Sequence, residues 1–289
     1  MKPELVAALT SQLIPELEPL PAGTWRALRN VPAAEFQDFV RMRLPGSDRK
    51  NIEKRLDRLS EFETQLSSLS ESGIRLVTEF EEDYPQLLHE RLGDKRPSHF
   101  FAAGNLALLN VQGIGIVGSR NVNAEGAQFA AEAGREAVRN GCAVISGGAG
   151  GVDEISMRAA LDSGGQTVGI LADSLFRKLG AWDLESGSIC LITSFTPNGG
   201  FQVRNAMARN KFIYAMSLGA VIVASDLELG GTWSGATEAL KLNLTPILVR
   251  DVDLPGNRAL ISKGGRPLKH PAQLADVLQA ATVTQDRLL

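Results

Sequence analysis

The chain has 289 residues, of which 44% are hydrophobic and 22% charged, and its formal net charge is −3 at pH 7. These values indicate an ordinary globular protein with enough apolar material for a large α/β domain and a small one. They exclude a globally basic surface, so any nucleic-acid site must be a local patch.

Local sequence argues against several other classes of protein. Cys142 and Cys190 lie beside apolar residues without metal-ligand spacing, and we predict buried strand thiols rather than a disulfide. No apolar run approaches the ~20 residues of a membrane span. The first residues also lack the pattern of a signal peptide. We therefore expect a cytoplasmic protein with no metal, cofactor or membrane partner.

Residues 1–72 show helical patterns and no strand pattern. Leucines recur every four residues from Leu5 to Leu17, and Asp48 can cap a helix that carries Ile52. We predict a small helical domain. Its basic side chains can contact phosphate, but the acidic residues among them favour a solvated helix face. These basic residues are Arg41, Arg43, Arg49, Lys50, Lys54, Arg55 and Arg58.

From residue 73 onward, apolar runs alternate with helical patterns. Short apolar runs are typical of buried parallel strands, which need a crossover that is usually helical. We therefore predict a second domain, residues 73–289, with a doubly wound, mostly parallel sheet. The expected strands are 74–77, 99–102, 114–117, 142–145, 167–171, 189–193, 220–224 and 246–249. The main expected helices are 124–140, 155–161, 212–218, 232–242 and 272–280, with a loop-rich chain from about 254.

Glycine turns follow the strands at 114–117 and 142–145. Gly118, Ser119 and Arg120 can bind an anion through backbone N–H groups, a hydroxyl and a guanidinium; a turn with its arginine in solvent is the alternative. The next turn offers a nest of N–H groups for phosphate oxygens. This predicted nest comprises Ser146, Gly147, Gly148, Gly150 and Gly151. The carboxyl ends of parallel strands form one ligand-binding edge, where we expect these turns to converge.

A dinucleotide fingerprint is not supported. Gly113-x-Gly115-x-x-Gly118 has the spacing, but its first two glycines fall at the start of or inside a strand rather than after it.

Further candidates lie downstream. Asp153, in the first turn of the next helix, can cap the backbone or contact a sugar hydroxyl. Gly231 and Thr232 form a third glycine turn that leads into a helix. Glu238 can be a catalytic carboxylate, but a lone helical glutamate is more typical of a solvated surface. Because no nucleophile–base pair is evident, we expect a binding protein rather than an enzyme.

The stretch from Ser186 to Ser225 contains no Asp or Glu and combines cations with aromatic residues. Single-stranded nucleic acid needs this combination, since cations pair with phosphates and ring faces stack on bases. We expect Phe201 to be an exposed stacking residue, and Phe212 and Tyr214 to belong to the core. The candidate cations are Arg204, Arg209 and Lys211.

In their order, these motifs resemble the DprA/Smf family of DNA-processing proteins. The resemblance joins Gly118-Ser119-Arg120, Ser146-Gly147-x-Ala149-x-Gly151-Val152-Asp153, Arg209-Asn210-Lys211 and Gly231-Thr232-x-x-Gly235-Ala236, within residues 74–268. It implies an extended Rossmann-like domain, usually dimeric, that binds single-stranded DNA in a basic pocket and helps to load RecA during transformation. On this chain the pocket would include Arg120, the 147–151 loop, Arg209 and Lys211.

Departures from the family pattern indicate a divergent, short paralogue. Met157 stands where the family usually has a histidine, and the run at 206–211 has one cation fewer than usual. Uptake, recombination and protection of DNA are all open as its role.

Two other functions fit the sequence. In a nucleotide-binding or nucleotide-cleaving sensor of the wider Rossmann-like superfamily, the glycine loops would hold a phosphate and Asp153 or Glu238 the sugar. In a scaffold, the N-terminal helices would recruit a partner.

Overall fold

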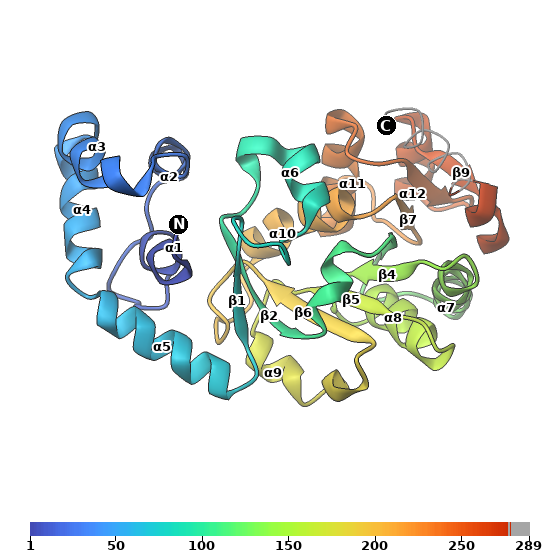
Figure 1. Cartoon of the computed structure of the whole chain (residues 1–289). Coiled ribbons are helices and arrows are strands. Elements are labelled where there is room, and N and C mark those ends of the chain that lie inside the picture. Colours follow the sequence, from blue (N-terminus) through green and yellow to red (C-terminus); the bar gives the residue numbers. More distant parts are fainter. Residues whose placement is uncertain (277, 279–289) are drawn as a thin grey trace.

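The computed structural model describes residues 1–276 and 278, and the strands within them form one nine-stranded sheet (Figure 1). The strands are β1 (Arg75–Thr78), β2 (His99–Gly104), β3 (Gly113–Val117), β4 (Ala143–Ser146), β5 (Thr167–Ile170), β6 (Ile189–Thr193), β7 (Gly219–Ile222), β8 (Ile247–Arg250) and β9 (Arg266–Leu268). Their order is β1-β2-β6-β5-β4-β3-β7-β8-β9. The strands from β6 to β9 in this order are parallel, and β1 and β2 add an antiparallel edge. The predicted mostly parallel sheet is confirmed.

The α-helices cover both faces of this sheet and form a group at its β1 edge. They are α1 (Pro3–Thr10), α2 (Ala22–Leu28), α3 (Phe36–Arg43), α4 (Gly46–Leu56), α5 (Leu59–Glu71), α6 (Gln86–Leu92), α7 (Ala124–Arg139), α8 (Val152–Asp162), α9 (Leu175–Leu179), α10 (Val203–Met216), α11 (Gly230–Leu242) and α12 (Pro255–Ser262). No described helix has both the length and the apolar character needed to cross a membrane.

The helices on the two faces of the sheet pack against two separate hydrophobic cores. Ile114 and Ile116 on β3 pack with α7 and α8, whereas Val117 packs with α10 and α11. This alternation follows from the two-residue period of a strand. Figure 1 shows α10 and α11 on the opposite side of the sheet from α7 and α8. Both predicted core aromatics, Phe212 and Tyr214, are buried on the α10 side.

Two expectations about elements are corrected, and a third is confirmed in part. The helix expected at 212–218 begins at Val203. Its first turns were not predicted because Val203 and Met207 are exposed there, so these turns show no buried apolar stripe. The region from 254, expected to be loop-rich, contains α12 and β9. Of the helix expected at 272–280, residues 274–276 and 278 are helical after a 3₁₀ turn at Pro271–Gln273, and residues 277, 279 and 280 lie outside the described residues.

The strand order fixes where a ligand can bind. From β3 the chain proceeds through α7 to β4 on one side, whereas β7, which follows α10, lies on the other side of β3. Open α/β sheets bind ligands in the crevice at such a switch point, outside the carboxyl ends of the strands. The loops after β3 and β7 therefore border the expected site.

The helices of residues 1–71 have a core of their own beside the β1 edge (Figure 1). Arg55, expected on a solvated or phosphate-binding face, is fully buried within them, and its guanidinium donates to the carbonyls of Ala8, Ser11, Leu17 and Glu18. Its role is structural, since a buried charge must be hydrogen-bonded.

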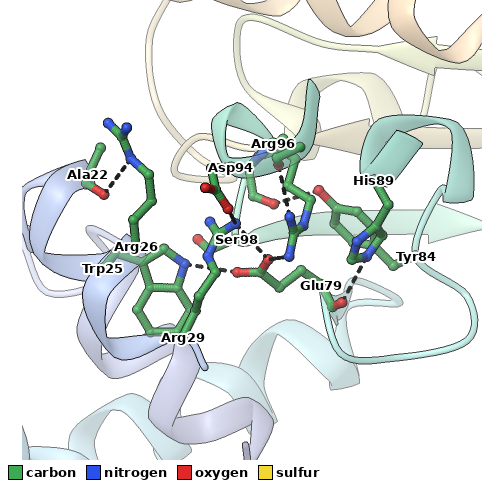
Figure 2. A network of polar contacts seen from close by, with 12 residues as sticks. Ala22, Trp25, Arg26, Arg29, Glu79, Tyr84, His89, Asp94, Arg96 and Ser98 are labelled. Carbon is green, nitrogen blue, oxygen red and sulfur yellow. Dashed lines mark hydrogen bonds and ion pairs between the residues drawn. The ribbon is translucent and has the colours of Figure 1, made fainter. Parts of the chain in front are cut away.

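A buried polar cluster joins these helices to the sheet domain (Figure 2). Trp25 Nε1 on α2 donates to Glu79 Oε1 at 2.8 Å, and Arg29 Nη1 lies 3.2 Å from Glu79 Oε2. Arg96 Nη2 approaches the same Oε2 to 2.6 Å. One buried carboxylate just after β1 therefore fixes α2 and the turn that precedes β2.

His99 provides a second junction, with a pH dependence that can be tested. Its Nδ1 lies 3.0 Å from Thr10 Oγ1 on α1 and 3.0 Å from Ser98 Oγ. Burial lowers the pKa of His99 to about 4. Between that value and the unfolded pKa of ~6.5, only the unfolded chain takes up the proton, so acidification destabilises the fold by up to about 3 kcal/mol.

We expect His99→Asn, which keeps an acceptor near the Nδ1 position, to lose less stability than the wild type as the pH falls from about 6.5 to about 4. Urea unfolding of both proteins across this range measures the difference and cancels the titration of other groups. Parallel pH profiles would contradict a neutral, buried His99.

Candidate functional site

A cavity of about 400 Å³ lies at the topological switch point of the sheet, and we call it the switch-point cavity. Its walls come from the loop after β3, the start of α8, the residues around the start of α10, the loop after β7 and the start of α11. Nine of the predicted residues line it: Gly118, Ser119, Arg120, Asp153, Phe201, Arg209, Asn210, Gly231 and Thr232. Segments far apart in sequence thus converge on one rim, as expected.

Backbone hydrogen bonds hold three of these loops together. Ser119 N donates to Ala224 O at 3.0 Å, and Val152 N donates to Ser119 O at 3.3 Å. Gly151 has a φ of 78°, and a Cβ there would lie 2.4 Å from Arg120 O. Glycine is thus required where the loop before α8 touches the loop after β3.

Asp153 forms the centre of the site. Burial raises the pKa of its carboxyl to about 6, although Arg209 and the backbone N–H groups of Gly147, Ala149 and Gly118 act to lower it. The backbone N–H groups near the carboxyl support one of the alternatives for Asp153, and a contact with a sugar hydroxyl stays a prediction. The carboxylate links the loop after β3 to the loop after β4.

This arrangement corrects the predicted phosphate nest. The Asp153 carboxyl lies against this loop, since a Cβ on Gly147 would lie 2.4 Å from Asp153 Oδ2, and the N–H groups of Gly147 and Ala149 act to lower its pKa. Ser146 is buried, and its hydroxyl donates to Ile116 O at 2.5 Å. None of the five predicted nest residues, which are Ser146, Gly147, Gly148, Gly150 and Gly151, lines the cavity.

The predicted cations have different environments. Arg209 is buried, donates from Nη1 to Ile170 O at 2.8 Å and lies 3.9 Å from Asp153 Oδ2, while its Nε has no hydrogen-bond partner among the described residues. Lys211 and Arg204 do not line the cavity. Lys211 Nζ lies 2.7 Å from Glu238 Oε1. Glu238, which the sequence analysis considered as a catalytic carboxylate, is therefore ion-paired with Lys211.

Arg120 and Phe201 form the exposed part of the cavity wall. The guanidinium carbon of Arg120 lies 4.8 Å from the centroid of the Phe201 ring, a cation–π geometry. Phe201 is 46% exposed, as expected of a stacking residue. No carboxylate among the described residues pairs with Arg120, so its charge is available to an anion.

Apolar side chains at the same rim were missed by the sequence analysis. Val203, Met207 and Leu229 line the cavity and are 67%, 45% and 69% exposed. The signal lay in the spacing of Val203 and Met207, four residues apart on one helix face, but only once the start of α10 is known. Together with Arg120 and Phe201 they make a surface suited to binding a flat ring that carries a phosphate.

The described residues contain no cluster of side chains suited to binding a metal ion. Within residues 1–276 and 278, no three His, Cys, Asp or Glu side chains are placed to hold a metal ion. Cys142 and Cys190 are free and buried, as predicted.

Comparison with known proteins identifies related sequences. Residues 75–279 match the family model described as DNA recombination-mediator protein A. The DNA processing protein DprA of Bacillus subtilis is 31% identical over 182 residues, which are 61% of this chain and 60% of that protein. A putative DNA processing protein DprA of Mycobacterium tuberculosis is 27% identical over 245 residues, 76% of this chain and 60% of that protein. The match thus spans about 60% of the length of these relatives.

Solved structures share the fold. DNA processing protein A from Streptococcus pneumoniae superposes with a TM-score of 0.71 at 18% identity, over 94% of this chain and 95% of that one. DNA processing protein A from Helicobacter pylori, described with its single-stranded DNA binding mode, gives a TM-score of 0.59 at 22% identity, over 72% and 96%. Both confirm the Rossmann-like architecture.

The packing around Asp153 predicts the effects of two glycine substitutions. A Cβ at Gly147 would lie 1.6 Å from Arg209 Nη1 and 2.4 Å from Asp153 Oδ2, whereas one at Gly150 would meet nothing within 4 Å. We expect Gly147→Ala to destabilise the protein by about 1–3 kcal/mol and Gly150→Ala to change stability by less than about 0.5 kcal/mol. Thermal and urea unfolding measure both. Equal effects of the two substitutions would contradict the packing of Arg209 on this loop.

Proposed function

Because this chain belongs to the DNA recombination-mediator protein A family, we propose that it binds single-stranded DNA and acts in DNA uptake, recombination or protection. The observation that carries the proposal is the exposed pair of Arg120 and Phe201 at the switch-point cavity. A guanidinium without an ion pair attracts a phosphate, and a ring face stacks on a base of any sequence.

The mechanism we propose is binding without bond cleavage. A base lies against Phe201 and the neighbouring apolar side chains Val203 and Met207, while its phosphate lies near Arg120. Arg209 contributes as a buried positive charge behind the cavity, with an Nε that the described residues leave unpaired. Asp153 and Glu238 are engaged with backbone N–H groups and Lys211, respectively, and we assign neither a catalytic step.

Further features of the proposal concern the assembly. We propose that residues 1–72 form a helical domain separate from the Rossmann-like domain at 73–289; the family match beginning at residue 75 and the separate core of the helices support this division. We also propose a cytoplasmic homodimer, with RecA or another recombination protein as a candidate partner, on the strength of family membership alone.

The second candidate function is binding of a free nucleotide. The observation in its favour is the cavity volume of about 400 Å³ at a switch point, where Rossmann-like domains hold nucleotides. A thermal-shift panel of mono-, di- and cyclic nucleotides tests it, because a ligand that binds only the folded state raises the melting temperature. Nucleotide-dependent stabilisation without oligo-dT binding would replace the DNA proposal.

The charge at Arg120 predicts a salt-dependent contribution to DNA affinity. We expect Arg120→Ala to weaken binding of labelled oligo-dT about threefold to tenfold at low salt and to reduce the salt slope by about 0.7. Fluorescence anisotropy at several salt concentrations measures both quantities. Lys241→Ala, which removes an exposed lysine on α11 outside the cavity, is the matched control. Equal losses in both variants would refute a specific role for Arg120.

Stacking on Phe201 should affect the affinity for DNA but not its salt dependence. We expect Phe201→Ala to cost about 1–3 kcal/mol of oligo-dT binding with little change in the salt slope, because stacking releases no counterions. Phe176→Ala is the matched control, since Phe176 is also partly exposed, at 38%, but lies outside the cavity. Unchanged affinity of the Phe201 variant would exclude the proposed stacking.

A further inference from the structure

A second basic cavity lies where the N-terminal helices meet the sheet domain. It measures about 410 Å³ and runs between α2 and the turn at residues 94–98, and we call it the α2 groove. Its cations are Arg26, Arg29, Lys95, Arg96 and Lys211. Among the described residues that line it, Asp94 is the one carboxylate. Neither the family match, which begins at residue 75, nor the motifs of the sequence cover α2.

Two largely buried guanidinium groups form the floor of the groove, and Glu79 and Asp94 balance their charge. Arg29 and Arg96 share the single carboxylate of Glu79, with contacts of 3.2 Å and 2.6 Å to Oε2. Asp94 is exposed and lies 3.8 Å from Arg29 Nη1. Figure 2 shows both guanidinium groups directed at Glu79, while that of Arg26 points away from it.

Arg29 leaves buried donors unsatisfied. Its side chain is 2% exposed, and among the described residues Nε has no hydrogen-bond acceptor, while Nη1 is ion-paired with Glu79 at 3.2 Å without forming a hydrogen bond. Burial is also the main cause that lowers the pKa of its guanidinium. Buried polar groups in proteins are nearly always hydrogen-bonded, so unpaired donors lining a basic groove mark a place for an anionic acceptor.

The rim of the groove adds charge that the protein does not neutralise. Arg26 and Lys95 are both exposed, and neither forms an ion pair with a described carboxylate. Arg26 makes only a hydrogen bond from Nε to Ala22 O, at 3.1 Å. Such side chains can follow a flexible chain of phosphates at little cost, because they break no ion pair of their own.

Helix α10 connects the two cavities. Val203 and Met207 line the switch-point cavity, and Lys211, four residues further along the same face, lines the α2 groove. At 1.5 Å per residue, the helix spans about 12 Å from Val203 to Lys211. A third hollow between them, lined by Arg204 and Ala208, shares Thr10 and Pro19 with the α2 groove. Residues of α10 therefore line all three hollows.

We propose that the α2 groove is a second phosphate-binding subsite for the same single strand of DNA. The strand whose base lies against Phe201 continues along α10, and its backbone phosphates lie between Arg26 and Lys95 above the buried guanidinium of Arg29. The N-terminal helices thereby form part of the DNA site instead of only recruiting a partner. This inference rests on the proposed function, because it extends the same bound strand.

The test compares a short and a long oligo-dT, about 6 and about 25 nucleotides, on a groove variant with Arg26→Glu and Lys95→Glu. Its matched control carries Lys50→Glu and Lys54→Glu, which change the net charge equally at exposed positions of α4 outside the groove. We expect the groove variant to bind the long strand about tenfold more weakly at low salt, with a salt slope lower by about 1.4 or more. The short strand should bind within about twofold of wild type, because it fills only the switch-point cavity.

The outcomes separate the two proposals. If the wild type binds neither strand at low salt, the proposed function fails. If the wild type binds and Arg120→Ala weakens both strands, but the groove variant binds the long strand as wild type does, the second subsite alone is refuted. An equal loss in the Lys50/Lys54 control would also refute it, by showing a non-specific charge effect. The milder pair Arg26→Gln and Lys95→Gln repeats the test if the reversed charges disturb the fold, which melting curves reveal.

Discussion

The site depends on one buried carboxylate. Asp153 lies in the first turn of α8, and the N–H groups of Gly118, Gly147 and Ala149 and the guanidinium of Arg209 act on its carboxyl. It thereby fixes the loops after β3 and β4 and the side of α10 relative to one another. A carboxylate can do this only where its charge is balanced, since an unpaired buried charge is strongly unfavourable. Gly147 must lack a Cβ for the guanidinium to fit.

This use of charge divides the cations of the chain into two kinds. Arg209, Arg55 and Arg29 are buried and hold elements together, whereas Arg120, Arg26 and Lys95 are exposed and have no carboxylate partner among the described residues. The second kind can pair with phosphate without breaking a contact that the fold requires. Glu79 plays the same part at the N-terminal junction as Asp153 does at the cavity. In both places a buried acid positions basic groups beside a hollow.

The local sequence predicted most of the fold, because strand and helix patterns are set by side chains a few residues apart. The runs at 189–193 and 124–140 lie within one residue of β6 and α7. The start of α10 was missed because its first turns face a cavity and carry exposed apolar groups instead of a single buried stripe. β9 was missed because a three-residue edge strand, Arg266–Leu268, has too few residues to show a period.

The sequence by itself determined that the glycine turns at Gly118 and Gly231, two of the arginines and Phe201 would meet at the carboxyl edge of a parallel sheet, since strand direction follows from the alternation of strand and helix. Tertiary structure alone decided which cations are free to pair with a phosphate. Arg120 and Arg209 look alike in the sequence, but only packing buries one against Asp153 and leaves the other over Phe201. It also decided that Arg26, Lys95 and Lys211, on three separate segments, share one groove. The physical reason is that burial and ion pairing depend on contacts between residues distant in sequence, which no local pattern records.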